Sequence, residues 1–201
     1  AEFIRVNHSI ADSCAIAVTC PAGTVVCTGD FKIDLTPIQG DVINLTRFGE
    51  LGKQGVLAML GESTNAERPG FTMSERKVGK SLDHIFRGCD KRIVIATFSS
   101  NVHRVQQIID YSHKYGRKVA LTGRSMLNII AAAQKFGYMD IPEGTLVDIN
   151  EIKRFKPEEL TIITTGSQGE PMSALYRMAF AEHDKVSLSD SDLVVISAST
   201  I

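Results

Sequence analysis

Short apolar runs alternate with stretches of helical apolar period throughout the sequence after residue 70. The apolar runs are predicted strands at 92–97, 118–122, 145–148, 160–165 and 193–198. The stretches between them predict helices at 72–87, 99–115, 125–136 and 172–183, the first opened by a capping box at Thr72-Met73-Ser74-Glu75. Strands that alternate with helices pair through crossover connections. The pattern therefore predicts an α/β fold with a mostly parallel sheet, covered by helices on both faces.

The beginning of the chain has a different, β-rich pattern. Two predicted strands, 13–20 and 24–28, flank a turn at Pro21-Ala22-Gly23, and a helix at 44–51 and a strand at 55–60 follow. Folding the hairpin about Ala22 brings Asp30 beside residue 14, at the end where the loop of His8 begins. The polar segment 65–70 contains Pro and Gly and is a predicted domain junction.

The composition excludes several classes of protein. The chain has 201 residues, 43% of them hydrophobic, which is typical of a globular protein. Its net charge of −1 gives no overall attraction to nucleic acid, so polyanion binding requires a local cluster or backbone dipoles. No apolar run approaches the roughly 18 residues of a membrane span. No signal peptide is visible in this sequence, and we therefore expect the four cysteines to be free thiols and not disulfides.

Both ends of the sequence look cut. The chain begins without Met in an apolar stretch and stops in the apolar run 193–198. We therefore expect a fragment, and function is inferred for the larger protein that contains it.

His8 and Asp30 are candidate metal ligands at one end of the predicted hairpin. Imidazole and carboxylate groups suit zinc or manganese. Two ligands do not complete a zinc site, which needs three or four. The alternative is a capping histidine and an aspartate that belongs to the turn Thr28-Gly29-Asp30.

Two turns that follow predicted strands are candidate phosphate sites. They are Ser99-Ser100-Asn101 and Ser167-Gln168-Gly169. Such turns lie at the carboxyl edge of a parallel sheet, where open α/β folds bind ligands, and the N–H groups of a helix N-terminus suit a phosphate. Alternatively the serines only cap their helices, with Ser99 or Ser100 expected to cap the helix that follows. The sequence contains neither of the two glycine-rich nucleotide-binding motifs, GxGxxG and GxxxxGK followed by Ser or Thr.

Glu62 ends the predicted strand 55–60, which we expect to be buried. A carboxylate at the end of a buried strand is a candidate catalytic group. The alternative roles are a cap or an ion pair with Lys or Arg.

Seven stretches occur in an order that resembles bacterial ribonuclease J, a family in the β-CASP branch of the metallo-β-lactamase superfamily. They are VNHSIADS (6–13), TGDFKID (28–34), ESTNAERPG (62–70), ATFSSNVHRVQQ (96–107), GRKVALTGRSM (116–126), GYMDIP (137–142) and TTGSQGEPMSAL (164–175). The resemblance extends over essentially the whole chain. It implies that residues 1–66 are the later, incomplete part of a metallo-β-lactamase domain. Residues 67–201 would be a nearly complete, Rossmann-like β-CASP domain.

The resemblance also implies roles for individual residues. His8 matches a histidine that binds one zinc, Asp30 matches an aspartate that bridges two zincs, and Glu62 matches the acidic position of motif A, where many family members carry Asp. The HxHxDH motif, which supplies other ligands and the acid/base aspartate, is absent from this sequence. We expect it to precede Ala1 in the parent protein. The zinc site is therefore expected to be incomplete here and the fragment alone to be inactive.

The function implied by this resemblance is that of a zinc-dependent ribonuclease in RNA maturation and decay. It would act as a 5′-exonuclease and an endonuclease by two-metal phosphodiester hydrolysis. The preferred partner would be 5′-monophosphorylated RNA, bound in part by the turns 99–101 and 167–169. The parent would be cytoplasmic, without membrane association, and a homo-oligomer or bound to a paralogue. The alternative is a non-catalytic RNA-binding subunit of a ribonuclease J complex.

Overall fold

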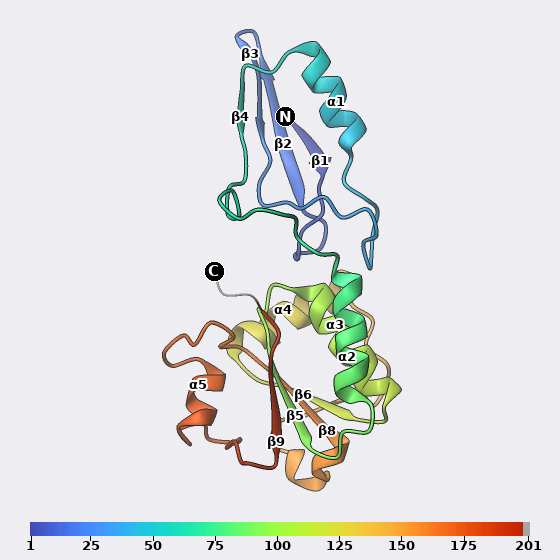
Figure 1. Cartoon of the computed structure of the whole chain (residues 1–201), viewed down its shortest axis with the longest axis vertical. Coiled ribbons are helices and arrows are strands. Elements are labelled where there is room, and N and C mark those ends of the chain that lie inside the picture. Colours follow the sequence, from blue (N-terminus) through green and yellow to red (C-terminus); the bar gives the residue numbers. More distant parts are fainter. Residues whose placement is uncertain (199–201) are drawn as a thin grey trace. The chain divides into compact units, whose positions relative to one another are not determined.

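The computed structural model describes residues 1–198 and shows two compact units (Figure 1). The first is Ala1–Val78, and the second begins at Gly79. Each unit has its own sheet and its own apolar core. Within the described residues, no helix has both the length and the apolar character needed to cross a membrane.

The first unit is built on a four-stranded sheet in the order β1-β2-β3-β4. Strands β1 (Glu2–Arg5), β2 (Cys14–Cys20) and β3 (Gly23–Cys27) are antiparallel, and β4 (Ala58–Leu60) pairs with β3 in parallel. Cys20 pairs with Gly23, so Pro21 and Ala22 form a two-residue hairpin loop. The predicted hairpin is confirmed, with Asp30 beyond the paired strand and close to the level of Ser13.

One face of this sheet packs against helix α1 (Leu45–Gln54), which begins at its N-cap Asn44. The core there is formed by alternate strand residues together with apolar residues from the segment 43–51; it consists of Ile4, Val6, Ala15, Ala17, Val26, Ile43 and Leu51. The intervening strand residues face the other way and are exposed, including Phe3 at 72% and Val18 at 49%. The first unit therefore has one buried and one exposed apolar sheet face.

A strand is present in the region predicted at 55–60, but the prediction that it is buried is wrong. Strand β4 covers only three residues, and all of them are exposed, Met59 at 66% and Leu60 at 62%. The physical reason is its position at the sheet edge, where β3 is its pairing partner on one side. The apolar character of the run indicated a strand but did not distinguish an edge from a core position.

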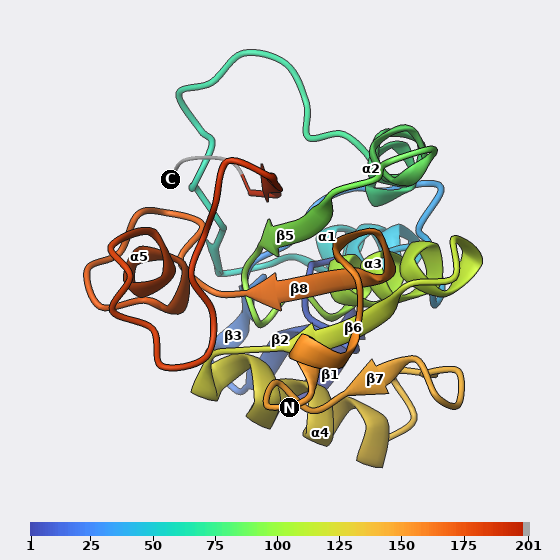
Figure 2. The same ribbon diagram turned by 90° about the horizontal axis from the view of Figure 1, so that it is seen from below.

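The second unit contains a five-stranded sheet in the order β7-β6-β8-β5-β9, and every pair in it is parallel. The strands are β5 (Arg92–Ala96), β6 (Lys118–Leu121), β7 (Leu146–Val147), β8 (Leu160–Thr164) and β9 (Asp192–Ile196). Figure 2 shows β5, β8, β6 and β7 side by side with their arrowheads pointing the same way. The predicted α/β fold with a mostly parallel sheet is confirmed.

Both faces of this sheet are covered. On one face, Val94, Ala120 and Ile162 form a row that packs with helix α5 (Ala174–Ala179) and the short helix η1 (Ile152–Arg154). Strand alternation turns the neighbours of these residues to the opposite face. Helix α3 (Val102–Lys114) contacts β6 and helix α4 (Arg124–Lys135) and contributes buried residues that include Val105 and Ile108. A second short helix, η2 (Pro157–Glu159), leads into β8.

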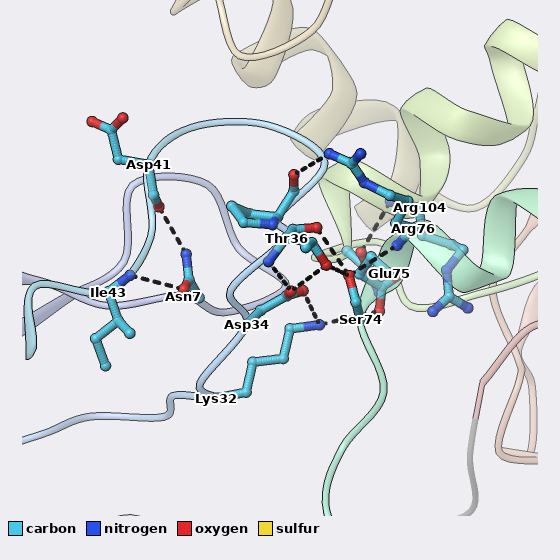
Figure 3. A network of polar contacts seen from close by, with 12 residues as sticks. Asn7, Lys32, Asp34, Thr36, Asp41, Ile43, Ser74, Glu75, Arg76 and Arg104 are labelled. Carbon is cyan, nitrogen blue, oxygen red and sulfur yellow. Dashed lines mark hydrogen bonds and ion pairs between the residues drawn. The ribbon is translucent and has the colours of Figure 1, made fainter.

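The compact units divide within helix α2 (Glu75–Phe86), between Val78 and Gly79. The sequence places the family-domain boundary earlier, at 66/67, and that assignment stays a prediction. The segment before the division is held in the first unit by polar contacts, drawn in Figure 3. The Ser74 hydroxyl donates to the Thr36 carbonyl at 3.0 Å, and Lys32 Nζ lies 3.7 Å from Glu75 Oε1.

Ser74 also determines where α2 begins. Its hydroxyl accepts the N–H of Arg76 at 3.3 Å, so Ser74 is the N-cap and Glu75 the first helical residue. The predicted capping box, which placed Glu75 three residues into a helix capped by Thr72, is wrong. The hydrogen bond from Ser74 to the Thr36 carbonyl selects Ser74, and this partner lies 38 residues away in the sequence.

Candidate functional site

Three predicted site residues follow strands that run in the same direction. Strands β1 and β3 are both antiparallel to β2, and β4 is parallel to β3, so β1, β3 and β4 share one direction. His8 follows β1, Asp30 follows β3 and Glu62 follows β4. The topology therefore brings an imidazole and two carboxylate side chains to one end of the sheet in the first unit.

The His8 and Asp30 side chains approach each other closely. Nε2 of His8 lies 3.9 Å from Oδ2 of Asp30, beyond hydrogen-bond range, and the two side chains are 28% and 73% exposed. Two ligands of one tetrahedral zinc, each at about 2.0–2.1 Å, are separated by about 3.3–3.4 Å. The donor types thus fit part of a zinc shell, and the 3.9 Å separation is wider than that of two ligands on one tetrahedral zinc. Among residues 1–198, no group of three or more His, Cys, Asp or Glu side chains is placed to hold a metal.

The turn that carries Asp30 depends on the residues that precede it. Gly29 has a φ of +59°, a backbone conformation that is unfavourable for residues with a Cβ. Thr28 is 5% exposed, and its hydroxyl donates to the Gly29 carbonyl at 2.8 Å. The Thr-Gly-Asp sequence therefore sets a fixed local geometry from which the Asp30 side chain projects.

Glu62 lies at the same end but follows an exposed edge strand, not the buried strand that the sequence predicts. Its backbone N–H donates to the Thr28 hydroxyl at 3.1 Å, and its Oε1 accepts the N–H of Thr64 at 2.7 Å. The carboxylate thus stabilises its own turn, and Thr28 connects this turn to the one that carries Asp30. The catalytic assignment of Glu62 stays a prediction.

The second unit brings the two predicted phosphate-binding turns to one edge. The turn 99–101 follows β5 and the turn 167–169 follows β8, and these strands are neighbours in the parallel sheet. Both turns therefore lie along the carboxyl edge, where ligands of open α/β folds bind.

The serines of these turns are not the helix caps. Asn101 caps α3, because its Oδ1 accepts the N–H of Arg104 at 3.0 Å. The prediction of Ser99 or Ser100 as the cap is therefore wrong: the Asn101 N–H bonds back to the Phe98 carbonyl, which delays the helix until Val102. Helix α5 is capped by Ser173, outside the turn 167–169.

Ser167 is the most unusual polar residue of this edge. It is 6% exposed, and its Oγ has no hydrogen-bond partner within residues 1–198. A buried hydroxyl without a partner is costly, because the loss of its bonds to water is not compensated. The preceding Gly166 has a φ of +106°, and a Cβ there would lie 2.3 Å from the Ser173 Oγ. The turn is consequently packed tightly against the start of α5.

Two basic side chains near this edge differ in availability. The Arg104 guanidinium donates to the carbonyl of Ser197 at 3.0 Å and to its hydroxyl at 2.8 Å, which attaches α3 to the segment after β9. Arg124 is exposed and begins α4, directly after the turn that follows β6. Arg124 is thus the more accessible cation for an anionic ligand.

The sequence did not identify Asn7 and Thr28, whose side chains bond distant segments beside the candidate metal ligands. Their hydrogen-bond partners lie up to 36 residues away, so no local sequence pattern indicates these contacts. The available signal was their position, since each lies within two residues of a candidate metal ligand.

The two units together indicate the class of this protein. The second unit is a parallel α/β unit, a class of fold that binds ligands at its carboxyl edge, and it is preceded by a β-rich unit that carries a candidate metal site. Residues 90–201 match the model of the family "Ribonuclease J, beta-CASP domain". The match covers more than half of the chain, and the chain belongs to this family.

Curated proteins named ribonuclease J are similar to the whole chain. The chain is 45% identical over 200 residues to ribonuclease J of Helicobacter pylori, 46% to that of Synechocystis sp. and 45% to that of Mycobacterium tuberculosis. All of this chain is covered in each comparison, but only 29%, 31% and 36% of the respective relatives. The chain therefore spans about a third of the length of these relatives.

A solved structure shares the fold. A crystal structure of a protein of unknown function from Enterococcus faecalis V583 superposes with a TM-score of 0.56 at 15% identity. The superposition covers 96% of this chain and 52% of that one. At this identity the likeness concerns the fold alone.

Proposed function

We propose that the protein containing this chain is a ribonuclease that hydrolyses RNA with the help of bound metal. The observation that carries the proposal is the 3.9 Å approach of His8 Nε2 to Asp30 Oδ2 at one end of the first-unit sheet. Membership of the ribonuclease J family and about 45% identity to curated ribonucleases J support RNA as the substrate.

His8 and Asp30 are the residues of this chain that would hold zinc. His8 offers a neutral imidazole nitrogen and Asp30 a carboxylate, both ordinary zinc ligands. When bound, a zinc pair would supply Lewis-acid polarisation of a phosphodiester. Since these two groups do not complete a coordination shell, we propose that the chain alone does not hydrolyse RNA and that further ligands come from the rest of the parent protein.

The carboxyl edge of the second unit would bind the RNA. Ser99 and Ser100 are not needed as caps, so their hydroxyls remain available there. The Ser167 hydroxyl has no hydrogen-bond partner among residues 1–198, but it is buried and would reach a phosphate only if the turn shifted. Backbone N–H groups and hydroxyls can bind phosphate oxygens without net positive charge, consistent with a chain of net charge −1. We propose that this edge prefers RNA that carries a 5′-monophosphate. We also propose that the protein containing this chain is cytoplasmic and that it forms a homo-oligomer or binds a paralogue.

The metal assignment is tested by Asp30→Ala in the protein that contains this chain. The variant should lose zinc, measured by elemental analysis, and should lose RNA hydrolysis while its circular dichroism spectrum is unchanged. Asp190→Ala, at an exposed position of the second unit, is the control and should keep both. Full zinc content in Asp30→Ala would show that the assignment is wrong. RNA binding without zinc or hydrolysis in the unmodified protein would favour a non-catalytic subunit instead.

The RNA-binding edge is tested by the combined change of Ser99, Ser100 and Ser167 to alanine. We expect weaker binding of 5′-monophosphorylated RNA, by about tenfold for one to two charge-assisted hydrogen bonds lost. Ser187→Ala is the control, because Ser187 lies at the opposite edge of the sheet, where its carbonyl accepts from Arg92. Undiminished affinity in the triple variant would leave the turns with a structural role only.

A further inference from the structure

Asn7 is a buried polar residue directly beside the candidate ligand His8. It is 9% exposed, and its carboxamide uses both of its ends. Nδ2 donates to the carbonyl of Asp41 at 2.9 Å, and Oδ1 accepts the N–H of Ile43 at 2.9 Å. Figure 3 shows the Asn7 side chain between these two residues. The segment 41–43 is therefore fixed to the backbone that carries His8.

The backbone of Asn7 makes a second connection, toward Asp30. The Lys32 N–H donates to the Asn7 carbonyl at 2.8 Å, and these residues form an isolated antiparallel bridge. His8 follows Asn7 by one residue, and Asp30 precedes Lys32 by two. This bridge thus joins the two segments, outside the strands, that carry the candidate ligands.

The chemistry of the site explains why an asparagine stands here. The position needs one donor and one acceptor about as far apart as the two ends of a carboxamide, which only Asn and Gln supply. An aspartate would direct an acceptor at the Asp41 carbonyl, itself an acceptor. An alanine would leave the N–H of Ile43, a residue 4% exposed, without its partner.

We propose that Asn7 is a positioning residue for the metal pair, holding His8 at its distance from Asp30 through the segment 41–43 and the bridge to Lys32. The inference rests on the proposed function, since it assumes that His8 and Asp30 bind zinc. Loss of the Asn7 side chain should leave both ligands present but loosely placed. Groups that orient metal ligands typically change metal affinity by about 10–100-fold when removed.

The test compares Asn7→Ala and Asn7→Asp with Arg5→Ala in the protein that contains this chain. Arg5→Ala is the matched control, because it removes the ion pair of Arg5 with Asp41 but leaves all three bonds of Asn7. Zinc affinity is measured by competition with a chromophoric chelator. We expect at least tenfold weaker zinc binding in Asn7→Ala, unchanged binding in Arg5→Ala, and recovery of kcat in Asn7→Ala at saturating zinc.

Each outcome decides the inference. A lower melting temperature of Asn7→Ala with unchanged zinc affinity would mean a merely structural role and would overturn it. If Asn7→Ala does not fold, Asn7→Asp serves in its place, because its Oδ1 can still accept from Ile43; wild-type zinc affinity in that variant would also overturn the inference. If Asp30→Ala loses zinc but the Asn7 variants do not, the positioning role of Asn7 is rejected and the proposed function is kept. A wild-type protein that binds no zinc rejects the proposed function as well.

Discussion

The hydroxyl of Thr28 accepts a hydrogen bond from the backbone N–H of Glu62 at 3.1 Å, across 34 residues of sequence. The same hydroxyl donates to Gly29, next to Asp30. One buried side chain thus connects the turn of a candidate metal ligand to the turn of a candidate catalytic carboxylate. The two acidic groups are therefore not placed independently.

Thr28→Val should destabilise the protein by about 1 kcal/mol, because it removes the hydroxyl while keeping the shape of the side chain. The free energy of unfolding in urea is the measurement. Thr19→Val is the control, since the Thr19 hydroxyl bonds Thr24 at 3.0 Å on an exposed surface and should change stability by less than about 0.5 kcal/mol. Equal effects of the two substitutions would contradict the special role of Thr28.

Asn101→Ala should cost about 1 kcal/mol of stability, because it removes the N-cap of α3. Ser100→Ala, one residue earlier, should cost clearly less, because that hydroxyl does not cap the helix. Thermal unfolding of both variants gives the comparison. A larger loss in Ser100→Ala would restore the sequence-based expectation that a serine starts the helix.

Gly166→Ala should be strongly destabilising, by about 3 kcal/mol or more, because the unfavourable φ of +106° is combined with a Cβ placed 2.3 Å from the Ser173 Oγ. Gly169→Ala is the matched control. Its φ of +73° is also positive, but a Cβ there meets nothing within 4 Å, so about 1–2 kcal/mol is expected. Chemical denaturation measures both values, and similar losses would refute the close packing of Gly166 against α5.

His183 should make stability depend on pH. Burial, and next the positive charge of Arg177, lower the pKa of His183 below its usual value, with Asp184 opposing. The neutral ring is held by the N–H groups of Lys185 and Val186, each donating to Nδ1 at 3.2 Å, and this places the proton on Nε2, toward Thr122. Protonation of Nδ1 would break both of these bonds.

The sign of the effect follows from the lowered pKa. Between the folded and unfolded pKa values the unfolded state binds more protons, so stability rises with pH. The contribution is fully present above about pH 6.5, the unfolded value, and is lost as the pH falls through the folded pKa. Wild-type protein should therefore lose more unfolding free energy than His183→Gln between about pH 7.5 and about pH 5. Parallel pH profiles would contradict this role of His183.

The α/β architecture was accessible from the sequence because the central strands are buried on both faces. Ile93 to Ala96 and Leu160 to Thr164 are buried throughout, so they read as continuous apolar runs between turn signals. The pairing of His8 with the Asp30 turn was also accessible, because a tight hairpin relates the two by counting residues across the strands.

The remaining features depend on distant partners. At 99–101 every residue is a good cap, and only the fold of the turn selects Asn101. The helix predicted at 172–183 is limited to 174–179, and Ala181, two residues beyond its end, takes a φ of +56°. Asn7 resembles any loop asparagine until the segment 41–43 is placed beside it.

The strand order β7-β6-β8-β5-β9 also has a consequence for biosynthesis. Strand β5 is made early, but its partners among residues 1–198 are β8 and β9, so its apolar residues have no sheet partner until Leu160 has left the ribosome. Long-range parallel pairing of this kind folds slowly and leaves apolar segments exposed in the meantime. Within this chain, the nascent segment 92–160 is therefore expected to expose apolar residues during translation until β8 is available to pair with β5.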